Sequence, residues 1–113
     1  NIHIFGTQNN LVINITDASL IRIKKLKDNK KKYNEKEIYF YEVNFFLEYI
    51  LYDNVGTVLA TTKVYSKRST TSSKFISLNE KERIIDSIIL DALIDLSSKS
   101  EELLKLHMFQ YIL

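Results

Sequence analysis

A long alternation of apolar and polar side chains predicts two paired β-strands in the middle of the chain. Between residues 39 and 51 every odd-numbered position is apolar or aromatic, whereas the even-numbered positions include Glu42, Asn44 and Glu48. Because successive side chains of a strand point to opposite faces, the odd-numbered positions predict a buried face. Residues 53–56, DNVG, then separate this run from a second strand-like run, so the sequence predicts one long antiparallel hairpin.

The second strand of this hairpin is expected to face inward with alternate residues, which are Val58, Ala60, Thr62 and Val64. It ends in Lys67 and Arg68, and the serine- and threonine-rich residues 69–77 follow. This composition predicts a basic, hydroxyl-rich loop. Lysine and arginine beside hydroxyl groups suit phosphate oxygens, so Lys67, Arg68 and Lys74 are the candidate anion-binding residues.

The even-numbered face of the first strand also carries large apolar side chains, namely Ile38, Phe40, Phe46, Ile50 and Tyr52. This is more apolar surface than a fully solvated sheet face usually exposes. We therefore expect another element or a partner protein to cover it, with Phe40, Phe46 and Ile50 as candidate partner-binding residues.

An earlier strand is predicted over residues 10–26, where the apolar pattern changes phase. Counting by alternation, Leu11, Ile13 and Ile15 fall on one face, Leu20 falls on the other, and Ile21 and Ile23 return to the first. The change of phase around residues 17–19 predicts a bulge or a break between two short strands. Residues 1–5 suggest an edge strand or a flexible lead-in, and residues 27–36 a charged turn.

The C-terminal third predicts an amphipathic helix, because apolar residues recur there at helical spacing: Leu78, Ile84, Ile85, Ile88, Ile89, Ala92, Leu93 and Leu96. A capping box is expected from Ser77 to Glu80 or from Asn79 to Glu82. The serine-rich residues 97–100 predict fraying or a break, after which a shorter second helix begins near Glu101.

These elements predict an α+β fold: an antiparallel sheet of three to four strands packed by the C-terminal amphipathic helix. With 113 residues, 45% of them hydrophobic, and no proline, the chain suits a single domain over residues 1–113 with one core. Since the chain begins with asparagine and shows no signal-like segment, we expect a processed fragment that lacks an N-terminal anchor.

Catalytic and cofactor chemistry is not indicated by the sequence. The absence of cysteine excludes disulfides and thiolate ligands, and His3 and His107 have no ligand spacing around them. Gly6 and Gly56 do not form a phosphate-binding loop. We therefore expect no enzyme activity, no catalytic residues, no metal and no cofactor. No apolar run approaches the roughly 20 residues of a membrane-spanning helix.

The order of elements resembles the LptE family of outer-membrane lipoproteins. The resemblance covers residues 41–104 and comprises a strand led by tyrosine, YEVNFFLEYILYD, a strand ending in basic and hydroxyl residues, VYSKRSTTSS, and a helix with an Asp-Ala pair, LNEKERIIDSIILDALIDL. It departs from the family before residue 10, where a strand and a helix are usual, and it lacks the lipidated cysteine.

The resemblance implies a non-enzymatic protein on the periplasmic side of the outer membrane. Its implied partners are a β-barrel of the LptD kind and lipopolysaccharide, whose phosphates would be met by Lys67 and Arg68, with Lys74 beside them. Membrane attachment would come only through an upstream lipid anchor.

Two alternatives remain open from the residues. Eight of the sixteen basic residues lie between Arg22 and Lys36, so this segment suggests a nucleic-acid or anionic-surface binding module, although the aromatic residues expected between the cations are few. A secretion or pilus subunit of the same general topology is the other alternative.

Overall fold

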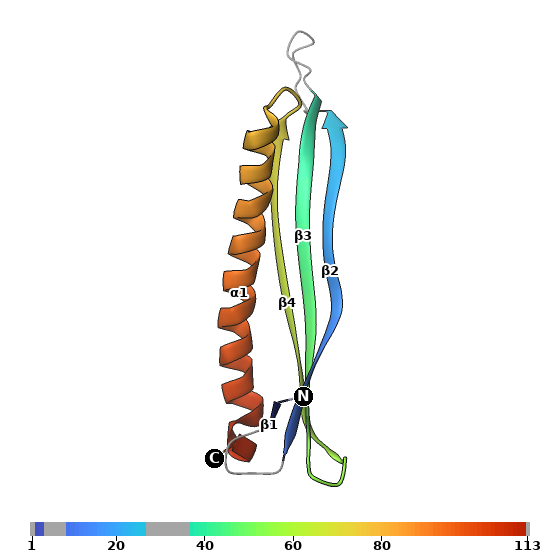
Figure 1. Cartoon of the computed structure of the whole chain (residues 1–113), viewed down its shortest axis with the longest axis vertical. Helices are drawn as coiled ribbons and strands as arrows, with labels where there is room; N and C mark the ends of the chain where they lie inside the picture. The colour runs from blue at the N-terminus through green and yellow to red at the C-terminus, as the bar shows by residue number, and fades with distance from the viewer. Residues whose placement is uncertain (1, 4–8, 27–36, 113) are drawn as a thin grey trace.

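The computed structural model describes residues 2–3, 9–26 and 37–112, and it is an α+β fold (Figure 1). The elements are β1 (Ile2–His3), β2 (Asn10–Leu26), β3 (Glu37–Tyr52), β4 (Val58–Ser73) and α1 (Leu78–Ile112). The strands form one antiparallel sheet in the order β1-β2-β3-β4. The molecule is a thin slab of 66 × 27 × 19 Å. The predicted turn over residues 27–36 and most of the predicted lead-in lie outside the described residues.

The predicted hairpin between β3 and β4 is confirmed, and its turn is organised by one carboxylate. Asp53 Oδ1 accepts hydrogen bonds from the backbone N–H of Val55 at 3.0 Å and of Thr57 at 2.8 Å. Gly56 has φ of +89°, a conformation that glycine adopts without the steric cost of a side chain. The alternation of side chains and the residues of the turn therefore both favour the same β3–β4 hairpin.

The predicted irregularity in β2 is a bulge, and Thr16 is the extra residue. Ile15 pairs with Leu47 and Asp17 pairs with Phe46, so Thr16 has no partner of its own on β3. Its hydroxyl instead donates to the carbonyl of Phe46 at 2.9 Å. The bulge moves Leu20 onto the face of Leu11, Ile13 and Ile15 and places Ile21 and Ile23 on the opposite face. The face assignment made by simple alternation was therefore wrong from Asp17 onward, because the extra residue reverses the phase, as the predicted bulge requires.

A second irregularity lies at the start of β4, where Leu51 pairs with Ala60 but Tyr52 pairs with Val58. Val58 consequently lies on the other face from Ala60 and is 50% exposed, so its predicted inward position is wrong. Thr62 and Val64 are buried as predicted.

The predicted loop over residues 69–77 is also wrong in its first half, because β4 continues to Ser73. Ser66 and Ser72 are buried on the same face as Val64. Their hydroxyls have partners there: Ser72 Oγ and the Tyr41 hydroxyl are 2.9 Å apart, and Ser66 Oγ donates to the Ala92 carbonyl at 2.8 Å. A buried hydroxyl that is hydrogen-bonded costs little free energy of desolvation. Serine can therefore occupy the buried positions of β4, and the strand continues through the serine-rich residues.

The C-terminal segment is one continuous helix of 35 residues, so the predicted break at residues 97–100 is wrong. The helix begins where expected, since Ser77 Oγ accepts a hydrogen bond from the backbone N–H of Glu80 at 3.1 Å. Within the serine-rich stretch, Ser100 is buried against the sheet and accepts a hydrogen bond from the Tyr49 hydroxyl. This contact with the sheet favours helix at a place where the local sequence is neutral.

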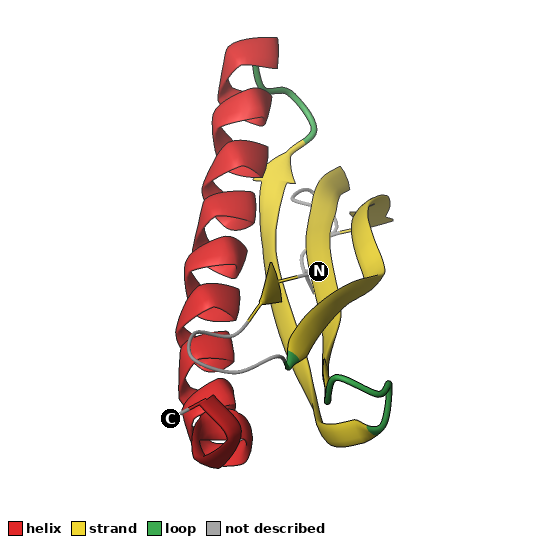
Figure 2. Ribbon diagram, turned by 60° about the horizontal axis from the view of Figure 1, so that its bottom comes forward, coloured by secondary structure: helices red, strands yellow, loops and turns green. Residues whose placement is uncertain are grey.

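The core lies between α1 and the odd-numbered face of β3, as predicted. Tyr41 and Val43 pack with Ile88 and Ala92 near the start of the helix, while a second cluster further along is formed by Leu11, Tyr49, Leu51, Val64, Leu96 and Met108. The helix runs alongside β4 and β3, and β2 forms the edge of the sheet furthest from the helix (Figures 1 and 2). The opposite face of the sheet is the one that the helix leaves uncovered.

Candidate functional site

The uncovered face of the sheet, here called the open face, carries the even-numbered residues of β3. It also carries the β4 residues paired with them, among them Lys63, Tyr65 and Lys67. Within the described parts of the chain no helix or strand lies over this face (Figure 2). Phe40, Phe46 and Ile50 are all there, as expected, and each is partly buried by its neighbours in the sheet.

An aromatic pair and a row of polar contacts form the centre of the open face. The rings of Phe46 and Tyr65 are 5.8 Å apart between centroids and tilted by 55°. The Tyr65 hydroxyl donates to Asn44 Oδ1 at 2.9 Å, and Asn44 Nδ2 donates to Glu42 Oε1 at 3.0 Å. Lys67 Nζ completes the row 3.4 Å from Glu42 Oε2. Because Asn44 and then Lys67 stabilise the charged carboxylate, the pKa of Glu42 lies below its usual value.

The apolar residues of the open face are separated by these polar ones. Phe40 and Phe46 are six residues apart, about 20 Å along the strand. Glu42 and Asn44 occupy the face between them, and Glu48 follows before Ile50. Lys25 Nζ lies 4.3 Å from the centroid of the Phe40 ring. The open face therefore alternates aromatic and charged groups along β3, and its apolar residues do not form one continuous patch.

The three candidate anion-binding residues do not converge on one point. Lys67 projects from the open face, whereas Arg68, its neighbour in β4, projects towards the helix side. Lys74 follows the end of β4. Lys67 and Arg68 are separated because consecutive residues in a strand point to opposite faces, and Lys74 lies beyond the end of that strand.

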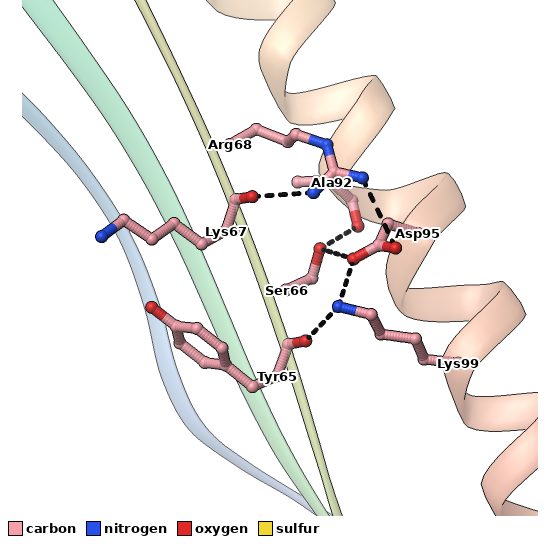
Figure 3. Close-up of polar contacts among 7 residues, drawn as sticks. All are labelled: Tyr65, Ser66, Lys67, Arg68, Ala92, Asp95 and Lys99. Carbon is pink, nitrogen blue, oxygen red and sulfur yellow. Dashed lines mark hydrogen bonds and ion pairs between the residues drawn. The ribbon is translucent and has the colours of Figure 1, made fainter.

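Arg68 belongs to a polar cluster at the junction of β4 and α1 (Figure 3). Its guanidinium lies 3.4 Å from Asp95 Oδ1 and donates to the Lys67 carbonyl at 2.8 Å. Asp95 Oδ2 is contacted at 2.8 Å by both Lys99 Nζ and Ser66 Oγ. The bonds from Lys99 and, after it, from Ser66 stabilise the charged carboxylate and hold the pKa of Asp95 below its usual value.

Lys74 is also engaged by a carboxylate. Its Nζ is 2.6 Å from Glu37 Oε2, and Lys24 Nζ is 3.1 Å from the same oxygen. The two cations lower the pKa of Glu37, and Glu37 in turn raises the pKa of Lys74. All three candidate cations are thus paired with an acid of the chain, and a phosphate would have to compete with that acid.

The basic segment over residues 22–36 is described only as far as Leu26. Arg22 lies over the ring of Tyr39 at 4.9 Å, and Lys25 lies over Phe40 on the other face of the sheet. Lys24 is the cation paired with Glu37. The described cations of this segment therefore face in two directions, and each is held by a residue of β3.

Sequence reasoning missed Asn44, Tyr65 and Asp95 as parts of these clusters. Phe46 lies beside Tyr65 because of the register of the hairpin. That register is set by the turn at residues 53–56 together with the irregularity beside the turn. The Asp95 cluster depends on where α1 places Asp95 beside Arg68, which the sequence pattern did not indicate.

Among the described residues, no group of three or more histidine, cysteine or acidic side chains is arranged to hold a metal ion. No helix among them is long and apolar enough to cross a membrane. A scan of protein-family models and searches of curated proteins and of solved structures found no match to this chain.

Proposed function

We propose that this chain is a non-enzymatic assembly protein of the LptE kind, which binds a β-barrel protein on the periplasmic side of the outer membrane and contacts lipopolysaccharide. The observation that supports it most strongly is the open face, where Phe40, Phe46, Tyr65 and Ile50 lie on one side of a sheet whose other side is packed by the helix.

The chemistry of the open face suits a barrel protein as partner. Aromatic side chains are enriched in protein interfaces, and on the open face they lie beside the central polar row of Glu42, Asn44 and Lys67. The strands are long and the slab is only 19 Å thick, so the open face offers an extended, narrow contact surface. Such a shape fits along the wall of a barrel.

Contact with lipid phosphate is assigned first to Lys67. It is half-exposed and lies on the same face as the aromatic pair, 3.4 Å from Glu42. A phosphate group that approaches this face would exchange one anionic partner of Lys67 for another. Arg68 and Lys74 are further candidates, but their carboxylate partners lie away from the open face.

The decisive experiment is capture of a barrel protein from a detergent extract of the source organism's membranes. We expect the wild-type chain to retain a barrel protein and the Phe40→Ser/Phe46→Ser/Ile50→Ser variant to lose it. The matched control replaces three exposed apolar residues of α1, Leu90→Ser/Leu106→Ser/Phe109→Ser, and should keep binding. A wild-type chain that retains no barrel protein contradicts the proposed partner.

Lipopolysaccharide contact is tested separately by NMR titration of the isolated chain. We expect the side-chain resonances of Lys67 to shift on addition of lipopolysaccharide, and Lys67→Gln to weaken that binding several-fold. Lys105→Gln, which removes an exposed helix cation paired with Glu101, is the control. Absence of any shift at Lys67 and Arg68 contradicts the proposed ligand while leaving the barrel partner untouched.

A further inference from the structure

The two long edges of the sheet differ in how far other parts of the chain cover their backbone. At the β4 edge, Lys99 Nζ donates to the Tyr65 carbonyl at 3.1 Å and Arg68 donates to the Lys67 carbonyl at 2.8 Å, while α1 runs alongside (Figure 3). At the β2 edge, β1 pairs only with Asn10 and Leu11. Over the described residues the remainder of the β2 edge has no strand beside it (Figure 1).

The β2 edge is only partly protected against pairing with another strand. Natural edge strands are usually short, or carry lysine, proline, inward-pointing charges or a β-bulge, all of which hinder pairing with another chain. β2 has Lys24, Lys25 and the bulge at Thr16, but its other features favour pairing. β2 has 17 residues, and five of its aliphatic side chains are 41–68% exposed: Ile13, Ile15, Leu20, Ile21 and Ile23. They lie on both faces of the strand. The regular part of β2 beyond the bulge is therefore long and apolar enough to accept another strand.

We propose that the occupant is a second copy of this chain, whose β2 pairs antiparallel with the first along residues 17–25 around a two-fold axis at Ile21. Partners in an antiparallel ladder must lie on the same face. In this register Ile21 meets its own copy, Ser19 meets Ile23 and Leu20 meets Arg22. The outermost open-face pair is Asp17 with Lys25, and it occurs twice by symmetry.

Neighbouring registers are less favourable for reasons of charge and length. An axis at Arg22 or Lys24 sets a cation against its own copy, and an axis at Ile23 sets Arg22 against Lys24. An axis at Leu20 limits the regular ladder to residues 17–23, because the bulge at Thr16 interrupts it. The axis at Ile21 gives the longest ladder without like charges opposite each other. Asp17, the single acidic residue of β2, then lies opposite Lys25 of the other copy.

The cations of β2 do not prevent this pairing, because β3 already holds Arg22 and Lys24, and the register sets Lys25 opposite Asp17. Arg22 lies over Tyr39, Lys24 is paired with Glu37 and Lys25 lies over Phe40. The dimer would be a continuous sheet with both helices on the same face, and the open faces of the two copies would form one surface. The barrel-binding face therefore stays accessible, and the proposal does not depend on the proposed function.

Cysteine cross-linking tests the register, since the chain has no cysteine of its own. In the Ile21→Cys variant the two new thiols face each other with Cα atoms about 4.5–5.5 Å apart, within reach of a disulfide. In the Ser19→Cys variant the copies of residue 19 are about 14 Å apart along the strands, beyond reach. We expect rapid cross-linked dimer from Ile21→Cys, and little from Ser19→Cys except when it is mixed with Ile23→Cys.

Charge reversal tests the pairing without oxidation, by sedimentation of the full chain over a wide range of concentration. We expect the wild type to dimerise, Asp17→Lys and Lys25→Asp each to raise the dissociation constant at least tenfold, and the double variant to recover. Arg83→Asp, on exposed helix surface, should leave the dimer unchanged. A wild type that stays monomeric at the highest concentration, or equal cross-linking at positions 19 and 21, overturns the proposal.

Discussion

Tyr49 in β3 and Ser100 in α1 are joined by a hydrogen bond of 2.9 Å, which the tyrosine hydroxyl donates to Ser100 Oγ. Both residues are buried, and they are 51 positions apart in the chain. The bond fixes where along the sheet this turn of the helix sits. It also gives the serine-rich stretch over residues 97–100 a reason to remain helical, because Ser100 is needed at the interface with β3.

The Tyr49 bond predicts an asymmetry between its two partners. Ser100→Ala should lower the free energy of unfolding by about 1–3 kcal/mol, because it leaves a buried phenol hydroxyl without an acceptor. Tyr49→Phe should cost only about 1 kcal/mol, since the serine hydroxyl can turn to a carbonyl of its own helix. Urea unfolding of both variants and of the double variant measures the difference. Equal effects of the two single variants would contradict this account.

The regular parts of the fold could be predicted because they follow local patterns. Alternation identified β3, the turn chemistry of Asp53 and Gly56 identified the hairpin, and Ser77 marked the start of the helix. The length of the helix could not be predicted in this way. Serine is a weak helix former, and the bond that favours Ser100 inside the helix comes from Tyr49, which is distant in the sequence.

The candidate site was predicted unevenly for a related reason. Phe40, Phe46 and Ile50 share a face because they lie in a recognisable strand, so their common position followed from alternation alone. Lys67 and Arg68 looked like a pair in sequence, yet they lie on opposite faces. Both residues were predicted within the second strand of the hairpin, where consecutive side chains already point to opposite faces, so their separation could have been predicted. The position of Asp95 beside Arg68 could not, because it depends on how α1 packs against β4.

The bulge predicts that deletion of Thr16 is tolerated. All other pairs between β2 and β3 keep their partners when this residue is removed, so the chain should lose only the hydrogen bond to Phe46, about 1 kcal/mol. Deletion of Ile23 is the control. The strand could keep its length only by losing the bulge, and residues 17–22 would then each shift by one position and point to the wrong face. Thermal unfolding should show a small loss for the first deletion and a severe one for the second. Equal losses would contradict the assignment of the extra residue.

The helix packing predicts that substitution of two aliphatic residues on the same helix has very different effects on the free energy of unfolding. Ile88 is 6% exposed and packs against Tyr41 and Val43, whereas Leu90 is 58% exposed on the same helix. Ile88→Ala should therefore cost about 2–5 kcal/mol, and Ile88→Asp should unfold the chain. Leu90→Ala should stay within about 0.5 kcal/mol of the wild type. Circular dichroism with denaturant unfolding measures both, and a stably folded Ile88→Asp variant would refute this packing.

The Asp95 cluster predicts a dependence of stability on pH that a single substitution removes. The pKa of Asp95 in the folded chain lies below the ordinary value of 3.8, mainly because Lys99 and Ser66 bond to the carboxylate. Its stabilising effect is therefore fully present above that ordinary value and is lost as the pH falls through the folded pKa. Asp95→Asn should melt at a lower temperature than the wild type at neutral pH, and the difference should close in strong acid. Asp91→Asn, one turn earlier and exposed, is the control and should melt like the wild type throughout. A difference between wild type and Asp95→Asn that persists below the folded pKa would show that the aspartate acts through packing and not through its charge.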